Sequence, residues 1–113
     1  LMAEYGACIS VITEAEMRFG VRRQPNATRL AKAVDAFLLD VPSLPWTSAT
    51  ATTYAELRTR MEIKGIGLSA MDLLIAAQAL AEDCTLVSAD RAFAQVPGLR
   101  LLDWSVPPTD MTP

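Results

Sequence analysis

A chain of 113 residues can build one domain with a sizeable core but is too short for two. Its composition is that of an ordinary globular protein, and no apolar run reaches the roughly 20 residues of a membrane helix. The net charge of −3 argues against a general electrostatic grip on nucleic acid, and the lack of histidine excludes histidine-based triads and histidine–zinc sites within the chain.

The two cysteines, Cys8 and Cys84, do not have metal-ligand spacing. No basic leader followed by an apolar stretch is present, so nothing indicates a signal peptide. We therefore interpret the cysteines as buried, reduced thiols of a cytoplasmic protein, although a single pair also allows a disulfide.

The first half of the chain predicts two strands and two helices. Residues 7–12 are apolar and partly β-branched, which is typical of a buried strand. Thr13 is expected to open a helix that ends near Gly20, and a second helix is expected over residues 26–39. Two prolines limit residues 41–44 to a short or edge strand.

The second half continues the alternation. A helix is expected over residues 47–64, with Gly65 as its stop, and another over residues 71–81. Residues 85–88 and 99–104 are expected to be strands. Strands that alternate with helices predict an α/β fold with a parallel sheet covered on both faces. The domain spans residues 1–104, and residues 105–113 are expected to be a disordered tail.

Three acidic residues occur at strand ends and helix starts. Glu16 follows the first strand, Asp72 lies in the first turn of the helix at 71–81, and Asp90 follows the strand at 85–88. Ligands of such folds bind beyond the carboxyl ends of the strands, where these residues could meet. Carboxylates a few ångström apart repel each other, and a magnesium ion with oxygen ligands at about 2.0–2.1 Å would turn that repulsion into binding.

Each acid also has a purely structural interpretation. Thr13-x-x-Glu16 fits a capping box, and Ser69-x-x-Asp72 approximates one. Asp90 could organise the turn into a short helix at residue 93. A cap contributes about 0.5–2 kcal/mol, so capping alone would explain each acid.

Three longer segments point to a known family. "ISVITEAEMRFG" resembles the strand–helix segment of PIN-domain ribonucleases of the VapC toxin type. "LPWTSATATTYAELRTRMEIKG" is similar to a later helix of that family, and "SAMDLLIAAQALAEDCTLVSADRAFAQVPGLRLLDW" is similar to its C-terminal part. The resemblance covers residues 9–104 in order, and it implies a PIN-like three-layer α/β/α fold.

The resemblance also implies a function. Members of the family are toxins of toxin–antitoxin pairs that cleave RNA phosphodiester bonds with a carboxylate-bound Mg²⁺ or Mn²⁺. By position, Glu16, Asp72 and Asp90 match the metal-binding acids, and Ser88 keeps a hydroxyl that helps to hold the water shell of the metal. An antitoxin and a second copy of the chain are the implied partners. A group of nearby arginines, among them Arg18, Arg22 and Arg23, could meet RNA phosphate.

The chain departs from the family in one important respect. The family begins with a central strand that carries "D-x-N", including a principal metal-binding Asp, and this sequence has no counterpart. We expect the neighbouring strands, which end at Ile12 and Ser88, to be left with unpaired edges unless another segment fills the gap. The alternative function is therefore a catalytically impaired PIN-like fragment that binds an antitoxin or a dimer partner.

Overall fold

We describe residues 6–103 of a computed structural model of the chain. Its strands form one parallel sheet in the order β2-β1-β3-β4, made of β1 (Ala7–Ser10), β2 (Ser43–Leu44), β3 (Thr85–Val87) and β4 (Leu101–Leu102). Its helices are α1 (Val11–Arg22), α2 (Thr28–Asp40), α3 (Ser48–Ile63), α4 (Ala70–Ala81) and the short 3₁₀ helix η2 (Arg91–Gln95). The predicted α/β fold with a parallel sheet is confirmed.

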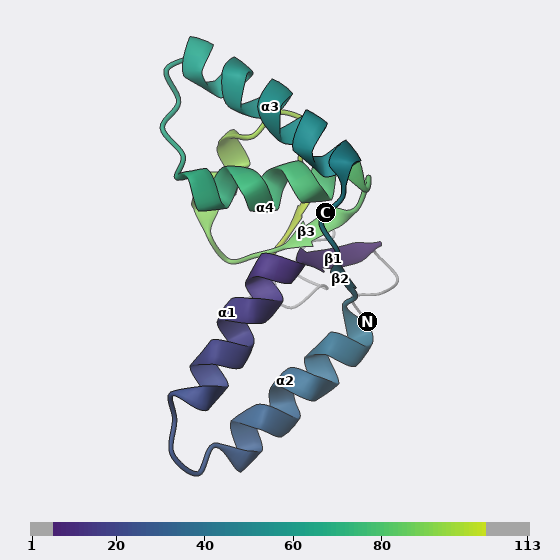
Figure 1. Cartoon of the computed structure of the whole chain (residues 1–113), viewed down its shortest axis with the longest axis vertical. Helices are drawn as coiled ribbons and strands as arrows, with labels where there is room; N and C mark the ends of the chain where they lie inside the picture. Colours follow the sequence, from purple (N-terminus) through teal and green to yellow (C-terminus); the bar gives the residue numbers. More distant parts are fainter. Residues whose placement is uncertain (1–5, 104–113) are drawn as a thin grey trace, which may run out of the picture.

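Helices cover both faces of the sheet, with α3 and α4 on one side and α1 and α2 on the other (Figure 1). Cys8 and Leu86 point to the α3/α4 side and pack with Leu57 and Met61 of α3. The alternate strand residues join a second cluster with side chains of α1 and α2; its buried members are Ala7, Ile9, Val41, Val87 and Leu102. The period of two along each strand thus divides the core into two layers.

The start of α1 differs from the prediction. The strand ends at Ser10, and α1 begins at Val11 because the Ser10 hydroxyl accepts a hydrogen bond from the Ile12 N–H at 3.1 Å. A serine in extended conformation is a good N-cap, so it ends the strand two residues earlier than the apolar run suggests. The capping box proposed for Thr13 and Glu16 is therefore wrong.

The other helix starts agree with the sequence. Thr47 caps α3, since its side chain accepts from the Thr50 N–H, and Ser69 caps α4, since its side chain accepts from the Asp72 N–H. The last strand is shorter than expected and is limited to β4, while Gly20 lies inside α1 instead of ending it. Trp104 and the predicted tail lie outside the described residues.

β1 and β3 are direct neighbours, which corrects the expectation of unpaired strand edges. Ala7 pairs with Thr85 and Cys8 pairs with Leu86, and the Thr85 N–H donates to the Gly6 carbonyl at 2.9 Å. The other edge of β1 pairs with β2. Within residues 6–103, β1 is therefore paired on both of its edges.

The same joint carries a disulfide between Cys8 and Cys84, so the interpretation of these residues as reduced thiols is wrong. Cys84 immediately precedes β3, and its Cα lies 6.1 Å from that of Cys8, within the range of protein disulfides. Residues separated by 76 positions in the sequence are therefore covalently joined. No helix in the part of the chain described here is long and apolar enough to cross a membrane.

Candidate functional site

The parallel sheet places the predicted site residues at one edge. The carboxyl ends of β1, β3 and β4 point the same way, and α1 begins directly after β1. Helix α4 runs back toward the start of β3, so its first turn lies on the same side as the segment that follows β3 (Figure 1). Glu16, Asp72, Ser88 and Asp90 all belong to these segments.

Ser88 and Asp90 line one surface pocket with a volume of about 300 Å³. The Asp90 N–H donates to the Ser88 hydroxyl at 3.0 Å, and the Ala92 N–H donates to Asp90 Oδ1 at 2.9 Å. Asp90 is therefore the N-cap of η2, which confirms the structural interpretation of this residue. The cap also fixes the carboxylate at the rim of the pocket, so the two interpretations are compatible.

Asp103 lines the same pocket, and it was not among the candidate residues that the sequence suggested. The cause is strand register: Val87 pairs with Leu102, and the Ser88 N–H donates to the Leu102 carbonyl at 3.1 Å. The residues that follow these pairs, Ser88 and Asp103, are therefore neighbours. The available signal was an acid near the end of the strand predicted at 99–104, which becomes informative only when the strand order is known.

Glu16 and Asp72 do not line this pocket. Asp72 is half-buried in the first turn of α4, where a negative charge suits the helix dipole. Glu16 is exposed in the second turn of α1 and has lost its capping explanation, because Ser10 caps that helix. The structure thus brings Ser88 and Asp90 together and leaves the other two acids separate along the same edge.

A second acid of α1, Glu14, is held by a cation. Arg18 Nε donates to Glu14 Oε2 at 2.8 Å, and this bond, with a smaller effect of the nearby Ser43 hydroxyl, lowers the pKa of the Glu14 carboxyl. The Ser43 hydroxyl has no hydrogen-bond partner of adequate geometry, so we regard Arg18 as the partner that matters. Arg18 also lies 3.7 Å from Asp35 of α2.

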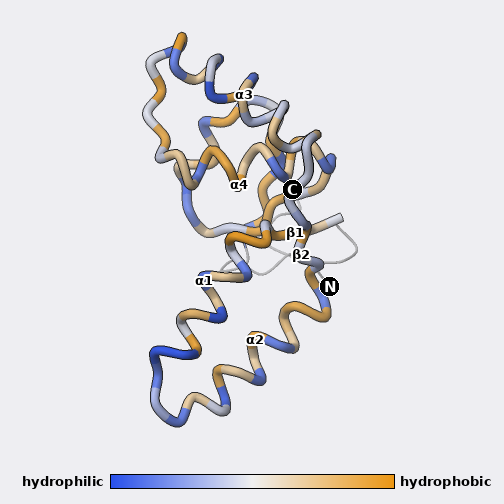
Figure 2. Tube along the Cα trace, in the orientation of Figure 1, coloured by the Kyte–Doolittle hydropathy of each residue, from blue (hydrophilic) through white to orange (hydrophobic). Residues whose placement is uncertain are grey.

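These contacts bear on the arginines that the sequence suggested for RNA. The guanidinium of Arg18 is engaged by carboxylates, and that of Arg23 lies 5.5 Å from the centre of the Phe19 ring. Arg22 lines a shallow pocket between α1 and α2. The turn that joins these helices is hydrophilic and lies at the end of the helix pair away from the sheet (Figure 2). Arg22, Arg23 and Arg29 lie in or next to this turn, so positive charge gathers there.

The donor set does not form a metal centre in this arrangement. Within residues 6–103, no group of three or more His, Cys, Asp or Glu side chains lies close enough to hold one ion together. Glu16, Asp72 and Asp90 therefore share an edge of the sheet without fitting a three-carboxylate site. Magnesium needs near-octahedral oxygen coordination at about 2.0–2.1 Å, which carboxylates spread along an edge do not supply.

Comparison with known proteins gives a consistent result. The family model described as "PIN domain" matches residues 1–99. Ribonuclease VapC2 of Rickettsia felis is 35% identical over 97 residues, which cover 85% of this chain and 72% of that protein.

Solved structures agree with this match. A crystal structure of VapBC2 from Rickettsia felis bound to a DNA fragment from their promoter aligns with a TM-score of 0.72 and 35% identity, over 84% of this chain and 72% of that one. DNA-bound VapBC from Salmonella typhimurium aligns with a TM-score of 0.72 and 28% identity, over 86% and 74% of the two chains. The expected PIN-like fold is thereby confirmed.

Proposed function

This chain belongs to the PIN domain family, and we propose that it is an endoribonuclease, the toxin of a toxin–antitoxin pair, which hydrolyses RNA phosphodiester bonds. The observation that carries the proposal is the family match over residues 1–99, together with relatives named as ribonucleases. The segments that resemble the family also contain strands whose carboxyl ends lie on the same side of the sheet, which is where a substrate would bind.

We assign the reaction to Glu16, Asp72, Asp90 and Ser88. Asp90 is fixed by the Ala92 N–H and Ser88 by the Asp90 N–H, so these two groups are held in place before substrate arrives. A positioned carboxylate can accept a proton from an attacking water, and a positioned hydroxyl can donate to a phosphate oxygen. Asp72 and Glu16 would contribute their carboxylates from the neighbouring helices.

Dependence on Mg²⁺ or Mn²⁺ is part of the proposal. If bound, a divalent ion would supply positive charge for a phosphate group. Since the acids within residues 6–103 do not form a three-ligand set, we assign no ligand geometry and no catalytic step to the ion. Calorimetric titration with Mn²⁺ measures whether the chain binds the ion.

The proposed partners are an antitoxin and a second copy of the chain, and the proposed place of action is the cytoplasm, where RNA is made. The similarity to VapBC structures supports an antitoxin as a partner. The idea that an unpaired edge of β1 drives association has lost its basis, because β1 is paired with β2 and β3. Sedimentation at micromolar concentration measures whether the homodimer forms.

The decisive experiment is cleavage of a single-stranded RNA with Mg²⁺ or Mn²⁺ by the wild-type chain, Asp72→Asn and Glu56→Gln. Glu56 is an exposed acid of α3 outside the site segments and serves as the matched control. We expect Asp72→Asn to lose at least about 100-fold in cleavage rate, in line with removal of a catalytic electrostatic group, and Glu56→Gln to retain it. Equal rates for all three proteins would refute the assignment.

The alternative function is a PIN-like binding module without activity, and the absence of a preformed metal centre in residues 6–103 favours testing it. It requires that the wild-type chain does not cleave RNA and binds Mn²⁺ no more tightly in calorimetry than Asp72→Asn does. Binding of an antitoxin with nanomolar affinity by such an inactive chain would then identify the module.

A further inference from the structure

The pocket beside Ser88 and Asp90 is lined by one positively charged side chain, that of Arg91. Its volume of about 300 Å³ is at the lower end for ligand pockets, so it takes a single phosphate group with part of its sugar and not several nucleotides. The lining also contains the carboxylates of Asp90 and Asp103. These repel a phosphate group, whereas a guanidinium attracts it. Entry of an RNA phosphate into this pocket would therefore depend on Arg91.

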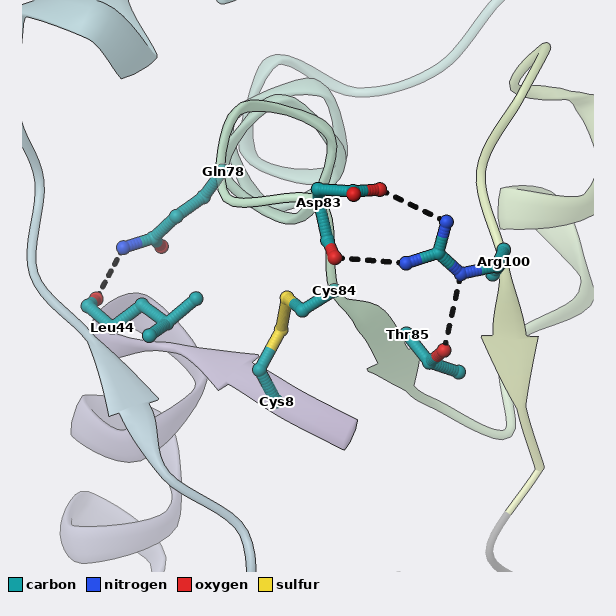
Figure 3. Close-up of a disulfide and its surroundings, with 7 residues drawn as sticks. All are labelled: Cys8, Leu44, Gln78, Asp83, Cys84, Thr85 and Arg100. Carbon is teal, nitrogen blue, oxygen red and sulfur yellow. Dashed lines mark hydrogen bonds and ion pairs between the residues drawn. A yellow bond between two sulfur atoms is a disulfide. The ribbon is translucent and has the colours of Figure 1, made fainter. Parts of the chain in front are cut away.

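Among the described residues, no other cation lines this pocket. All ten lysines and arginines of the chain lie within residues 6–103, and Arg91 alone is in the lining. Arg100 is near it in the sequence, but its guanidinium donates to Thr85, the first residue of β3 (Figure 3), whereas the pocket lies beyond the other end of that strand. Arg18 and Arg58 are held by carboxylates of their own helices. The positive charge that a phosphate needs here is therefore that of Arg91.

The Arg91 side chain is exposed, while its backbone is held in place. Arg91 is the first residue of η2 and directly follows the cap residue Asp90. Phe93 of the same short helix is 4% exposed and packs in one cluster with side chains of α3 and α4, which anchors η2 to the domain. Within residues 6–103 the Arg91 guanidinium forms no hydrogen bond or ion pair. It is therefore available to a ligand without any other contact being broken.

We propose that Arg91 binds a phosphate group of the RNA substrate and holds it beside Ser88 and Asp90. The guanidinium is planar and presents paired N–H donors, which match two oxygens of one phosphate. The Ser88 hydroxyl accepts from the Asp90 N–H at 3.0 Å, and its own hydrogen can donate to the same phosphate. The inference rests on the proposed ribonuclease function, and it assigns to Arg91 the contact that the sequence suggested for arginines within residues 18–23.

Binding of a fluorescently labelled single-stranded RNA, followed by anisotropy, tests this contact. Every protein in the comparison carries Asp72→Asn, which should stop cleavage and does not alter the lining of the pocket. Into this background we place Arg91→Gln, which removes the charge, and Arg91→Lys, which keeps it. Arg60→Gln is the matched control, since Arg60 is an exposed arginine of α3 outside the pocket.

Arg91→Gln should weaken RNA binding about tenfold, as expected for loss of one charge-assisted hydrogen-bonded contact. It should also reduce the slope of log affinity against log salt concentration by about 0.7, because one phosphate fewer is neutralised. Arg91→Lys should keep the slope and lose less affinity, since it retains the charge without the paired donors. Arg60→Gln should match the background in both measurements. If Arg91→Gln has the same affinity and slope as Arg60→Gln, the proposal is overturned.

Urea denaturation distinguishes binding of RNA from an effect on folding. Because the Arg91 side chain is exposed and its guanidinium has no partner within residues 6–103, Arg91→Gln and Arg91→Lys should unfold at the same urea concentration as the wild type. Weaker RNA binding with unchanged unfolding is then a direct effect on the contact. If both variants unfold at lower urea concentration and lose binding to the same extent, Arg91 supports the fold and the proposal is overturned.

RNA cleavage separates this inference from the proposed function. With Asp72 intact and RNA well below saturation, Arg91→Gln should cleave about tenfold more slowly than the wild type, and Arg60→Gln should cleave at the wild-type rate. If the wild type cleaves RNA and Arg91→Gln cleaves it equally fast, the role of Arg91 is overturned and the proposed function stands. If the wild type does not cleave RNA, the proposed function fails, and the salt dependence of binding alone decides whether Arg91 contacts phosphate.

Discussion

Substitutions of Gln78 test whether water reaches the core between α4 and β2. The residue is 1% exposed, and its side-chain nitrogen donates to the Leu44 carbonyl (Figure 3). Its side-chain oxygen, Oε1, is buried without a hydrogen-bond partner. A buried polar atom of this kind lowers the free energy of unfolding, because on folding it loses its hydrogen bonds to water and forms none within the protein.

Gln78→Met keeps the length of the side chain and removes both polar groups. Loss of the bond leaves the Leu44 carbonyl without this donor and costs about 1–3 kcal/mol, and removal of the unpaired oxygen recovers about 1–3 kcal/mol. The two terms are of similar size, so we expect the free energy of unfolding to change by no more than about 2 kcal/mol in either direction. Gln78→Ala should instead cost about 2–5 kcal/mol, because it leaves a cavity.

Gln78→Glu adds a test by pH. Burial raises the pKa of the new carboxyl in the folded chain above its value of about 4.3 in the unfolded chain. Between the two pKa values the folded state binds more protons, so the variant should lose stability as the pH rises from 5 to 8. Urea denaturation of the wild type and the three variants at both pH values measures these differences.

Two results would refute this account of Gln78. If Gln78→Met is destabilised by more than about 2 kcal/mol, the side-chain oxygen has a partner that stabilises the fold. If Gln78→Glu unfolds at the same urea concentration at pH 5 and pH 8, water reaches the site and the pKa of the carboxyl is not raised.

Three further predictions concern helices α1 and α3. Thr47→Ala removes the side-chain cap of α3 and should cost about 1 kcal/mol in urea denaturation, with the helix otherwise retained. Leu57→Ala, at a buried position of α3, should cost about 2–5 kcal/mol, whereas Ile63→Ala, 80% exposed on the same helix, should stay within about 0.5 kcal/mol of the wild type. The bond to Arg18 lowers the pKa of Glu14 in the folded chain. The ionised Glu14 carboxylate therefore stabilises the fold above the ordinary glutamate pKa of 4.5, and this stabilisation is lost as the pH falls through the lower pKa of the folded chain. Acidification through this range should therefore destabilise the wild type more than Glu14→Gln, and parallel acid-unfolding curves would contradict this.

Local patterns predicted most of the secondary structure. The helices α2, α3 and α4 begin and end within two residues of their expected bounds, because periodicity and caps such as Thr47 and Ser69 are properties of neighbouring residues. Leu57 and Met61 of α3 are buried in one cluster with side chains of α4. The N-cap role of Ser10 was not predicted, because Ser10 is buried and lies within an apolar run that the sequence pattern assigns to the strand.

Features that depend on strand order could not be predicted in this way. The expected strand edges were wrong because β1 closes directly on β3, and no pattern near residue 7 or residue 85 specifies that pairing. The disulfide and the place of Asp103 beside Ser88 follow from the same topology. The sequence resemblance identified which acids to consider. The distances between their carboxylates depend on contacts between the segments, which the sequence of each segment does not specify.

The pairing of β1 with β3 also has a consequence for synthesis of the chain. A ribosome synthesises β1, α1, α2 and β2 before the residues that form β3 exist, and a domain generally folds as a unit. Until residue 85 is made, one edge of β1 lacks its partner strand, and until α4 is made, Cys8 lacks its cover. The contacts that complete the sheet join residues far apart in the sequence, which slows folding. Nascent chains that stop short of β3 are therefore the ones expected to pair with other strands or to require a chaperone.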